Sequence, residues 1–126
     1  MFGIASNQRI DTGSIRVMLS TLGLREGIDA FTSYNSWVTV CGEDKFKNTG
    51  ISVVSDSDIY NSQELSKLVD NELQSDAHLI SLLYLKYGLQ TFEKLRGPFS
   101  ICIIDKKNNE VMIVTDRFGI KPVVYY

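Results

Sequence analysis

The sequence of 126 residues contains few cysteines and histidines, the residue types from which many metal and redox sites are built. Its two cysteines, Cys41 and Cys102, are too few for a disulfide scaffold or a metal cluster, and the single histidine, His78, excludes a histidine-rich site. Only two prolines and nine glycines exclude fibrous and low-complexity chains. The composition therefore gives no reason to expect a metal ion or another cofactor.

Neither sign of charge dominates, and no long apolar run is present. The formal net charge of −2 argues against a partner held by bulk charge, such as nucleic acid or an anionic membrane. The apolar runs 101–104 and 120–126 are strand-sized, well short of the ~20 residues of a membrane span. Residues 1–6 have no basic stretch before an apolar core, so they do not resemble a secretory signal. We expect a cytoplasmic protein.

The length and the 44% hydrophobic content predict one globular domain over residues 1–126. Apolar periodicity and turn residues predict alternating helices and antiparallel strands, an α+β fold. The expected strands cover 2–5, 37–41, 51–54, 99–105, 110–115 and 123–126, with a hairpin loop at 42–50. The expected helices cover 15–24, 63–73 and the segment from Ser75 or Asp76 to Gly88, followed by a helical turn at 91–95.

Polar residues that can carry chemistry follow the expected strand 51–54. Asp56 and Asp58 flank Ser57, and two carboxylates so spaced can support acid–base work or bind a cation. A turn with solvated aspartates explains the same pattern and is the simpler interpretation.

The second polar group stands at a helix start. Asp76 is explained by capping, and its pairing with His78 is poor because residues two apart on a helix point to different faces. The two cysteines lie in apolar strands and are interpreted as core residues. The segment 116–122 contains Arg117 and Lys121, but without a glycine-rich loop leading into a helix it is interpreted as a structural turn.

Taken in order, these segments resemble the glutamine amidotransferase domain of asparagine synthetases, the class II, N-terminal-nucleophile type. Residues 1–5 (Met-Phe-Gly-Ile-Ala) resemble the family start Met-Cys-Gly-Ile-Ala. Residues 58–65 resemble the stretch around Asn-Gly-Glu-Ile-Tyr-Asn, and 75–78 its Ser-Asp-Thr-Glu. The most specific matches are 95–105, with Leu-x-Gly-x-Phe, and 116–126, with Arg-Asp-x-x-Gly-x-Lys-Pro-Leu-Tyr-Tyr. The segment 25–50 matches weakly and is shorter than in the family.

The resemblance implies a fold and a set of site residues. The fold would be an N-terminal-nucleophile hydrolase-like αββα sandwich, two antiparallel sheets flanked by helices, in shortened form. Its remnant substrate cleft would contain residues at the positions of the family's oxyanion donor and substrate ligands: Asp56, Ser57, Asp58, Asp76 and His78.

The departures from the family pattern fall on its chemistry. The family nucleophile is an N-terminal cysteine, whereas residue 2 is Phe2, and a phenyl ring cannot attack an amide. A large second residue also predicts that Met1 is retained. Asp56 replaces the asparagine whose side chain donates to the oxyanion, and losing one such donor costs ~10²–10³ in rate. The arginine that clamps the substrate carboxylate has no evident match, and only Asp76 is kept among the amine ligands. No catalytic residue is therefore assigned.

Three functions stay open from the sequence. The first is a degenerate amidotransferase-type domain that lacks glutaminase activity and acts as a binding or interaction module. The second is a component of an asparagine-synthetase-like or cyclase system, whose activity would be glutamine-hydrolysing asparagine synthesis, with the ATP-dependent synthetase domain on a separate or missing chain. The third is a hydrolase using Ser6, Ser55 or Ser57. The expected partners are a synthetase subunit or a second copy bound through the C-terminal edge, residues 123–126.

Overall fold

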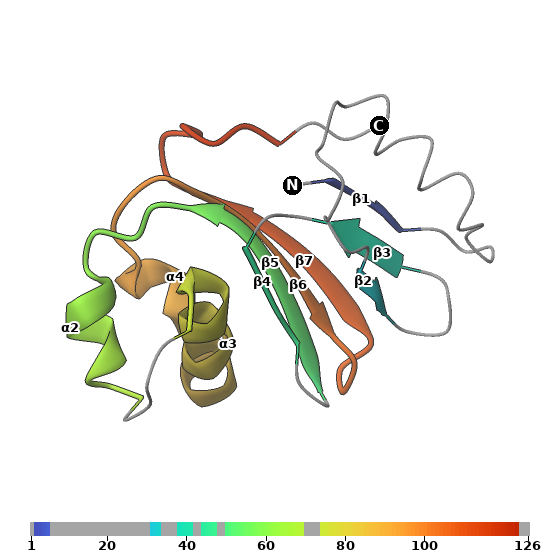
Figure 1. Ribbon diagram of the computed structural model, residues 1–126, viewed down its shortest axis with the longest axis horizontal. Helices are drawn as coiled ribbons and strands as arrows, with labels where there is room; N and C mark the ends of the chain where they lie inside the picture. Colours follow the sequence, from blue (N-terminus) through green and yellow to red (C-terminus); the bar gives the residue numbers. More distant parts are fainter. Residues whose placement is uncertain are drawn as a thin grey trace.

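The computed structural model describes part of the chain in detail. The described residues are 2–5, 31–33, 38–41, 44–47, 50–69 and 74–123, with side chains for 46, 50–69 and 74–123. Most of this part forms a four-stranded antiparallel sheet with helices on one side and a smaller antiparallel sheet on the other (Figure 1). The predicted α+β class is therefore confirmed.

The larger sheet has the strand order β4-β5-β6-β7. Its strands are β4 (Asp44–Lys47), β5 (Ile51–Ser57), β6 (Phe99–Asp105) and β7 (Glu110–Thr115). Every residue of β6 is buried, as expected for an apolar central strand covered on both faces. The β6–β7 hairpin turns through Asn109, which takes φ 57 as the Asn-Asn pair predicts.

The smaller sheet has the order β1-β3-β2, all antiparallel. It consists of β1 (Phe2–Ala5), β2 (Phe31–Ser33) and β3 (Val38–Cys41). The predicted strand over 2–5 is confirmed, and the one predicted over 37–41 is found at 38–41. The strand β2 was not predicted, because its three residues are too short to show alternation.

The helical layer packs against one face of the larger sheet. It contains α2 (Ser62–Ser66), α3 (Asp76–Tyr87), a 3₁₀ turn η1 (Gly88–Gln90) and α4 (Thr91–Lys94). The Ser75 Oγ caps α3 by accepting a hydrogen bond from the His78 N–H at 3.2 Å. Gly88 ends the helix with φ 58, a conformation that favours glycine. The sequence predicted a start at Ser75 or Asp76 and an end at Gly88, and the structure selects Ser75 as the cap.

The main core fills the space between α3 and the sheet. Leu79, Ile80 and Leu83 of α3 are fully buried against residues of β5 and β6, including Val53 and Ile103. A second, smaller apolar cluster lies on the opposite face of the sheet and consists of Val54, Cys102 and Ile104. The central strands β5 and β6 are therefore buried on both faces.

Two strand predictions were wrong. The expected loop 42–50 contains β4, because charged residues are tolerated in a strand at the edge of a sheet. The strand expected to break after residue 54 continues to Ser57, because Asp56 and Ser57 pair with Ser100 and Phe99 of β6. Pairing across the sheet outweighs the low strand propensity of aspartate and serine.

The helix predicted over 63–73 was also wrong in length within the described residues, and its last part, 70–73, lies outside them. The helix α2 ends at Ser66, and its N-cap residue Asn61 makes no side-chain cap. Instead, Asn61 Nδ2 donates to the Lys94 carbonyl, and its Oδ1 accepts from the Arg96 N–H, both at 3.0 Å. These bonds tie the start of α2 to the segment after α4.

Some predictions concern residues outside the described part. The helix at 15–24 lies there completely, and the strand at 123–126 lies there except for Val123, which is not in a strand. Within the described residues, no helix is long and apolar enough to cross a membrane.

Candidate functional site

The polar residues considered for the site lie around the end of β5. Three segments meet there: the chain that follows β5, the segment that precedes β6 and the segment that follows β7. The Asp58 N–H donates to the Pro98 carbonyl at 3.0 Å, and the Tyr60 N–H donates to the Arg96 carbonyl at 2.8 Å. Gly97 is required between them: it has φ 125, and a Cβ there would collide with the Asp58 carbonyl oxygen. This end of the sheet is therefore a closely packed set of loops.

Asp116 organises the segment after β7. Its buried carboxylate accepts hydrogen bonds from four backbone N–H groups at 2.9–3.3 Å, those of Phe99, Phe118, Ile120 and Lys121. Burial alone would raise the pKa of Asp116, but these hydrogen bonds outweigh it and lower the pKa. The structural turn predicted at 116–122 is thus a loop folded around one carboxylate.

Asp56 is ion-paired. The Lys121 Nζ lies 2.7 Å from Asp56 Oδ1, and both side chains are partly exposed. The hydrogen bond to Asp56 and the charge of Asp56 raise the pKa of Lys121, with a smaller contribution from the charge of Asp58. The end of β5 therefore holds two carboxylates and one ammonium group.

Ser57 and Asp76 form a second polar contact. The Ser57 Oγ donates to Asp76 Oδ2 at 3.0 Å, and the Ile59 N–H donates to the same oxygen at 3.4 Å. Ser57 also contacts the Ser55 Oγ at 3.3 Å. Asp76 therefore joins the first turn of α3 to the end of β5, and the expectation that it caps the helix was wrong because Ser75 does so.

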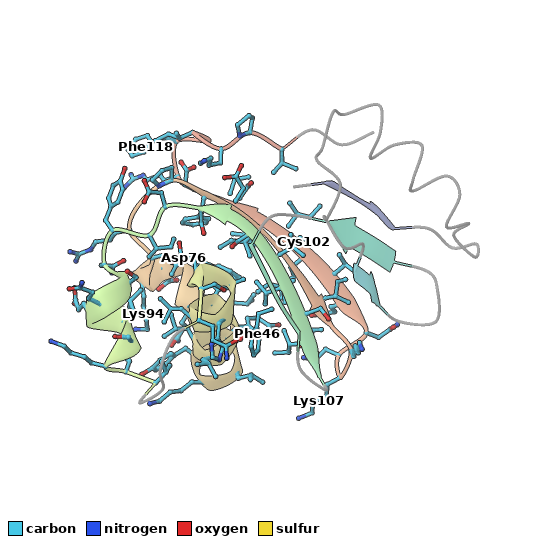
Figure 2. All side chains as sticks on the ribbon, in the orientation of Figure 1. Phe46, Asp76, Lys94, Cys102, Lys107 and Phe118 are labelled. Atoms are coloured by element: carbon cyan, nitrogen blue, oxygen red, sulfur yellow. The ribbon has the colours of Figure 1, made fainter. Side chains whose placement is uncertain are left out.

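His78 stands apart from both contacts. Its ring stacks on Phe46 of β4 with centroids 4.1 Å apart, and its Nδ1 accepts from the Gln74 N–H at 3.3 Å. Figure 2 labels Phe46, which belongs to β4, and Asp76, the first residue of α3, at separate places. His78 therefore does not serve as a base for Ser57 in this arrangement, in agreement with the poor Asp76–His78 pairing expected from their spacing.

The candidates also divide between the two faces of the sheet. Side chains alternate along β5, so Asp56 shares the face of Val54, whereas Ser57 shares the helix-covered face of Val53. Figure 1 places β1, which begins at Phe2, on the Val54 side of the sheet. The structure thus brings together Asp56, Asp58 and Lys121, and separately Ser57 and Asp76.

Lys121 is the site residue that sequence reasoning missed. Its position next to Pro122 in the family-like segment 116–126 was the available signal, but its partner is 65 residues earlier in the chain and no local pattern indicates it. Cys102 is buried, as predicted, and burial raises its pKa to about 11, so it is not a reactive thiolate at neutral pH. The side chains of Phe2, Ser6 and Cys41 lie outside the described part.

Chemically, this region is rich in hydrogen-bond acceptors. Asp56, Asp58 and Asp76 carry carboxylates, and the Lys121 ammonium is engaged by Asp56. Ionised carboxylates accept hydrogen bonds and do not donate them. The Asp56–Asp58 side of this region, where the one ammonium group is already engaged, suits an amine or ammonium group better than it suits an oxyanion.

Comparisons with known proteins agree with the motifs. A family model described as "Glutamine amidotransferase domain" matches residues 43–126. This stretch contains β4 to β7, the described helices and every candidate residue except Phe2 and Ser6.

Several curated relatives are named as glutamine-hydrolyzing asparagine synthetases. The chain is 40% identical over 91 residues to asparagine synthetase 2 of Bacillus subtilis, which covers 68% of this chain. It is 37% identical over 73 residues to the enzyme of Triphysaria versicolor and 35% identical over 74 residues to that of Zea mays, each covering 56% of this chain. The chain spans only 12–13% of the length of these relatives.

Proposed function

Because this chain belongs to the glutamine amidotransferase domain family and is related to asparagine synthetases, we propose that it is an amidotransferase-type domain without glutaminase activity. It acts as a binding or interaction module. The observation that carries this proposal is the Asp56–Lys121 ion pair at 2.7 Å.

Negative charge at the position of the oxyanion donor opposes glutamine hydrolysis. By resemblance to the family, the residue at position 56 donates a hydrogen bond to the oxygen that becomes negative during amide hydrolysis. An ionised Asp56 presents negative charge there, and its Lys121 partner is already engaged. Phe2, at the family's nucleophile position, has no group that can attack the amide. Two independent requirements of the reaction are therefore unmet.

The proposal includes the αββα sandwich of the N-terminal-nucleophile hydrolases. Two antiparallel sheets and a helical layer on the outer face of one of them support it. In such a sandwich, Phe2 and Asp56 would both border the space between the sheets, which would be the remnant cleft.

Ammonia release from L-glutamine tests the loss of hydrolysis. We expect background rates from the wild type and from Phe2→Cys, because the single change leaves Asp56 at the oxyanion position. The Bacillus subtilis asparagine synthetase serves as the active control. Turnover above background by either the wild type or Phe2→Cys would refute the proposal.

Ligand binding is tested separately by calorimetric titration with L-glutamine. We expect Asp56→Asn and Asp76→Asn to differ: Asp76 is at the family's amine-ligand position, so its loss should abolish binding, whereas loss of Asp56 should preserve it. Absence of heat with the wild type would remove glutamine as the ligand and leave only the interaction role.

A second candidate function is favoured by the length comparison. The matched relatives are named as asparagine synthetases, and this chain spans only 12% of their length. In this candidate function an ATP-dependent synthetase domain supplies the remaining chemistry, and the case in which that domain is a separate chain can be tested directly. Co-expression with a synthetase chain encoded next to this one should give a complex that co-elutes. Separate elution of the two chains would argue against this candidate.

A further inference from the structure

The strand β7 lies at the edge of the four-stranded sheet. It pairs with β6 along its length, from Ser100 opposite Thr115 to Asp105 opposite Glu110. No other described strand pairs with it. Among the described residues its outward backbone N–H and C=O groups therefore have no strand partner, and another strand can pair with them.

One face of β7 is also apolar and exposed. Val111 and Ile113 lie opposite Ile104 and Cys102, so they extend the smaller apolar cluster towards the edge. Their side chains are 40% and 55% exposed. Edge strands are usually protected by lysine, proline or a bulge, and the sequence of β7, Glu-Val-Met-Ile-Val-Thr, contains neither lysine nor proline.

We propose that this edge binds a second copy of the chain, through antiparallel pairing of β7 with β7 about a two-fold axis. Such an axis perpendicular to the sheet requires one residue to lie opposite itself, because only then do the two copies share faces. The candidate central residues are Met112 and Ile113. This proposal does not depend on the proposed function.

The apolar residues select between the two registers. With Met112 opposite itself, Glu110 faces Val114, and Val111 faces Ile113 of the other copy, so the exposed apolar residues form one continuous strip. With Ile113 opposite itself, Val111 would face Thr115, which interrupts this strip. Apolar side chains directly opposite each other stabilise a strand pair. The geometry therefore favours the Met112-centred register.

Light scattering coupled to size-exclusion chromatography tests the association. Because an edge-only interface is small, we expect the mass to rise towards that of a dimer only at high concentration, roughly 0.5 mM. Ile113→Lys should keep the chain monomeric, whereas Leu89→Lys, also at an exposed apolar residue but in η1, should not. A wild type that stays monomeric, or a dimer unaffected by Ile113→Lys, would overturn the proposal.

Cysteine cross-linking tests the register. Residues directly opposite each other have Cα atoms ~4.5–5.5 Å apart, within the range of a disulfide. Met112→Cys should therefore form a reducible dimer under mild oxidation. Val114→Cys is the matched control, since Val114 lies on the same face and is also partly buried. In this register the two Val114 residues of a dimer are far apart, so this variant should not cross-link. Cross-linking of Ile113→Cys in place of Met112→Cys would overturn the register.

Discussion

A single carboxylate, Asp116, holds the segment that follows β7. Its pKa is lowered, so folding favours its ionised form, and the stability it contributes is present above the pKa of the unfolded chain. This contribution is lost as the pH falls below about 3.8 through the lowered folded value. The amide of asparagine has one carbonyl oxygen and no charge, so it cannot replace the four contacts.

We therefore expect Asp116→Asn to lower the melting temperature at neutral pH and to flatten its decline below pH 4. Thermal unfolding followed by circular dichroism over pH 2–7 measures both effects. Glu93→Gln, at an exposed residue of α4, is the control and should reproduce the wild-type profile. If the melting temperature of Asp116→Asn declined below pH 4 as steeply as that of the wild type, this role would be contradicted.

Gly97 is the second residue on which the loops at the end of β5 depend. Gly97→Ala would bring a Cβ against the Asp58 carbonyl and would strain a backbone with φ 125. We expect a loss of roughly 2 kcal/mol or more in the free energy of unfolding. Gly50→Ala is the control, since a Cβ there meets nothing within 4 Å. Denaturant titration measures both variants, and equal stabilities would refute the argument.

At the scale of elements, α3 is amphipathic in its contacts. Leu83 is fully buried against the sheet, whereas Leu85, two residues later, is 59% exposed. Leu83→Ala should lower the free energy of unfolding by about 2–5 kcal/mol, and Leu85→Ala should change it by less than about 0.5 kcal/mol. The pair compares the same substitution in one helix, so similar losses would show that α3 does not pack as described.

The elements that were predicted correctly are determined by residues within or directly next to them in the sequence. The helix α3 was predicted from Ser75 and Gly88, and β6 from its continuous apolar run. The errors concern elements set by distant partners: β4 and the last three residues of β5 exist because neighbouring strands pair with them. Local propensity does not contain this information.

The same distinction explains the candidate site. The spacing of Asp56, Ser57 and Asp58 indicated a polar strand end, and the structure places them there. Their partners were not predictable, since Lys121 and Asp76 come from other elements. The family resemblance located the residues, but only the fold showed that Asp56 and Ser57 lie on opposite faces.

At the scale of the whole molecule, Tyr84 and Asp105 link α3 to the β6–β7 turn. The Tyr84 hydroxyl donates to Asp105 Oδ2 at 3.2 Å, and Asp105 also accepts from Asn108. Burial, followed by the hydrogen bond to Asp105, raises the pKa of Tyr84 from 10.0 to about 12. The stability from the protonated hydroxyl is therefore complete below pH 10 and is lost as the pH rises through 12.

We expect the wild-type melting temperature to fall between pH 10 and 12, and Tyr84→Phe to fall less steeply from a lower starting value. Tyr60→Phe is the control, because this tyrosine is 72% exposed. Its profile should follow that of the wild type, so that the difference between the two variants isolates Tyr84. If the melting temperatures of Tyr84→Phe and the wild type fell equally steeply between pH 10 and 12, a contribution of Tyr84 to the pH dependence would be excluded.

The neighbouring positions of β5 and β6 have a consequence for synthesis on the ribosome. These strands pair directly although the whole helical layer, residues 58–98, is translated between them. A nascent chain that ends within α3 holds β5 with its β6 side unpaired and with Val53 lacking its partner Ile103. The larger sheet closes only after β6 has left the exit tunnel, so folding of this layer is delayed until residue 105 has emerged from the ribosome.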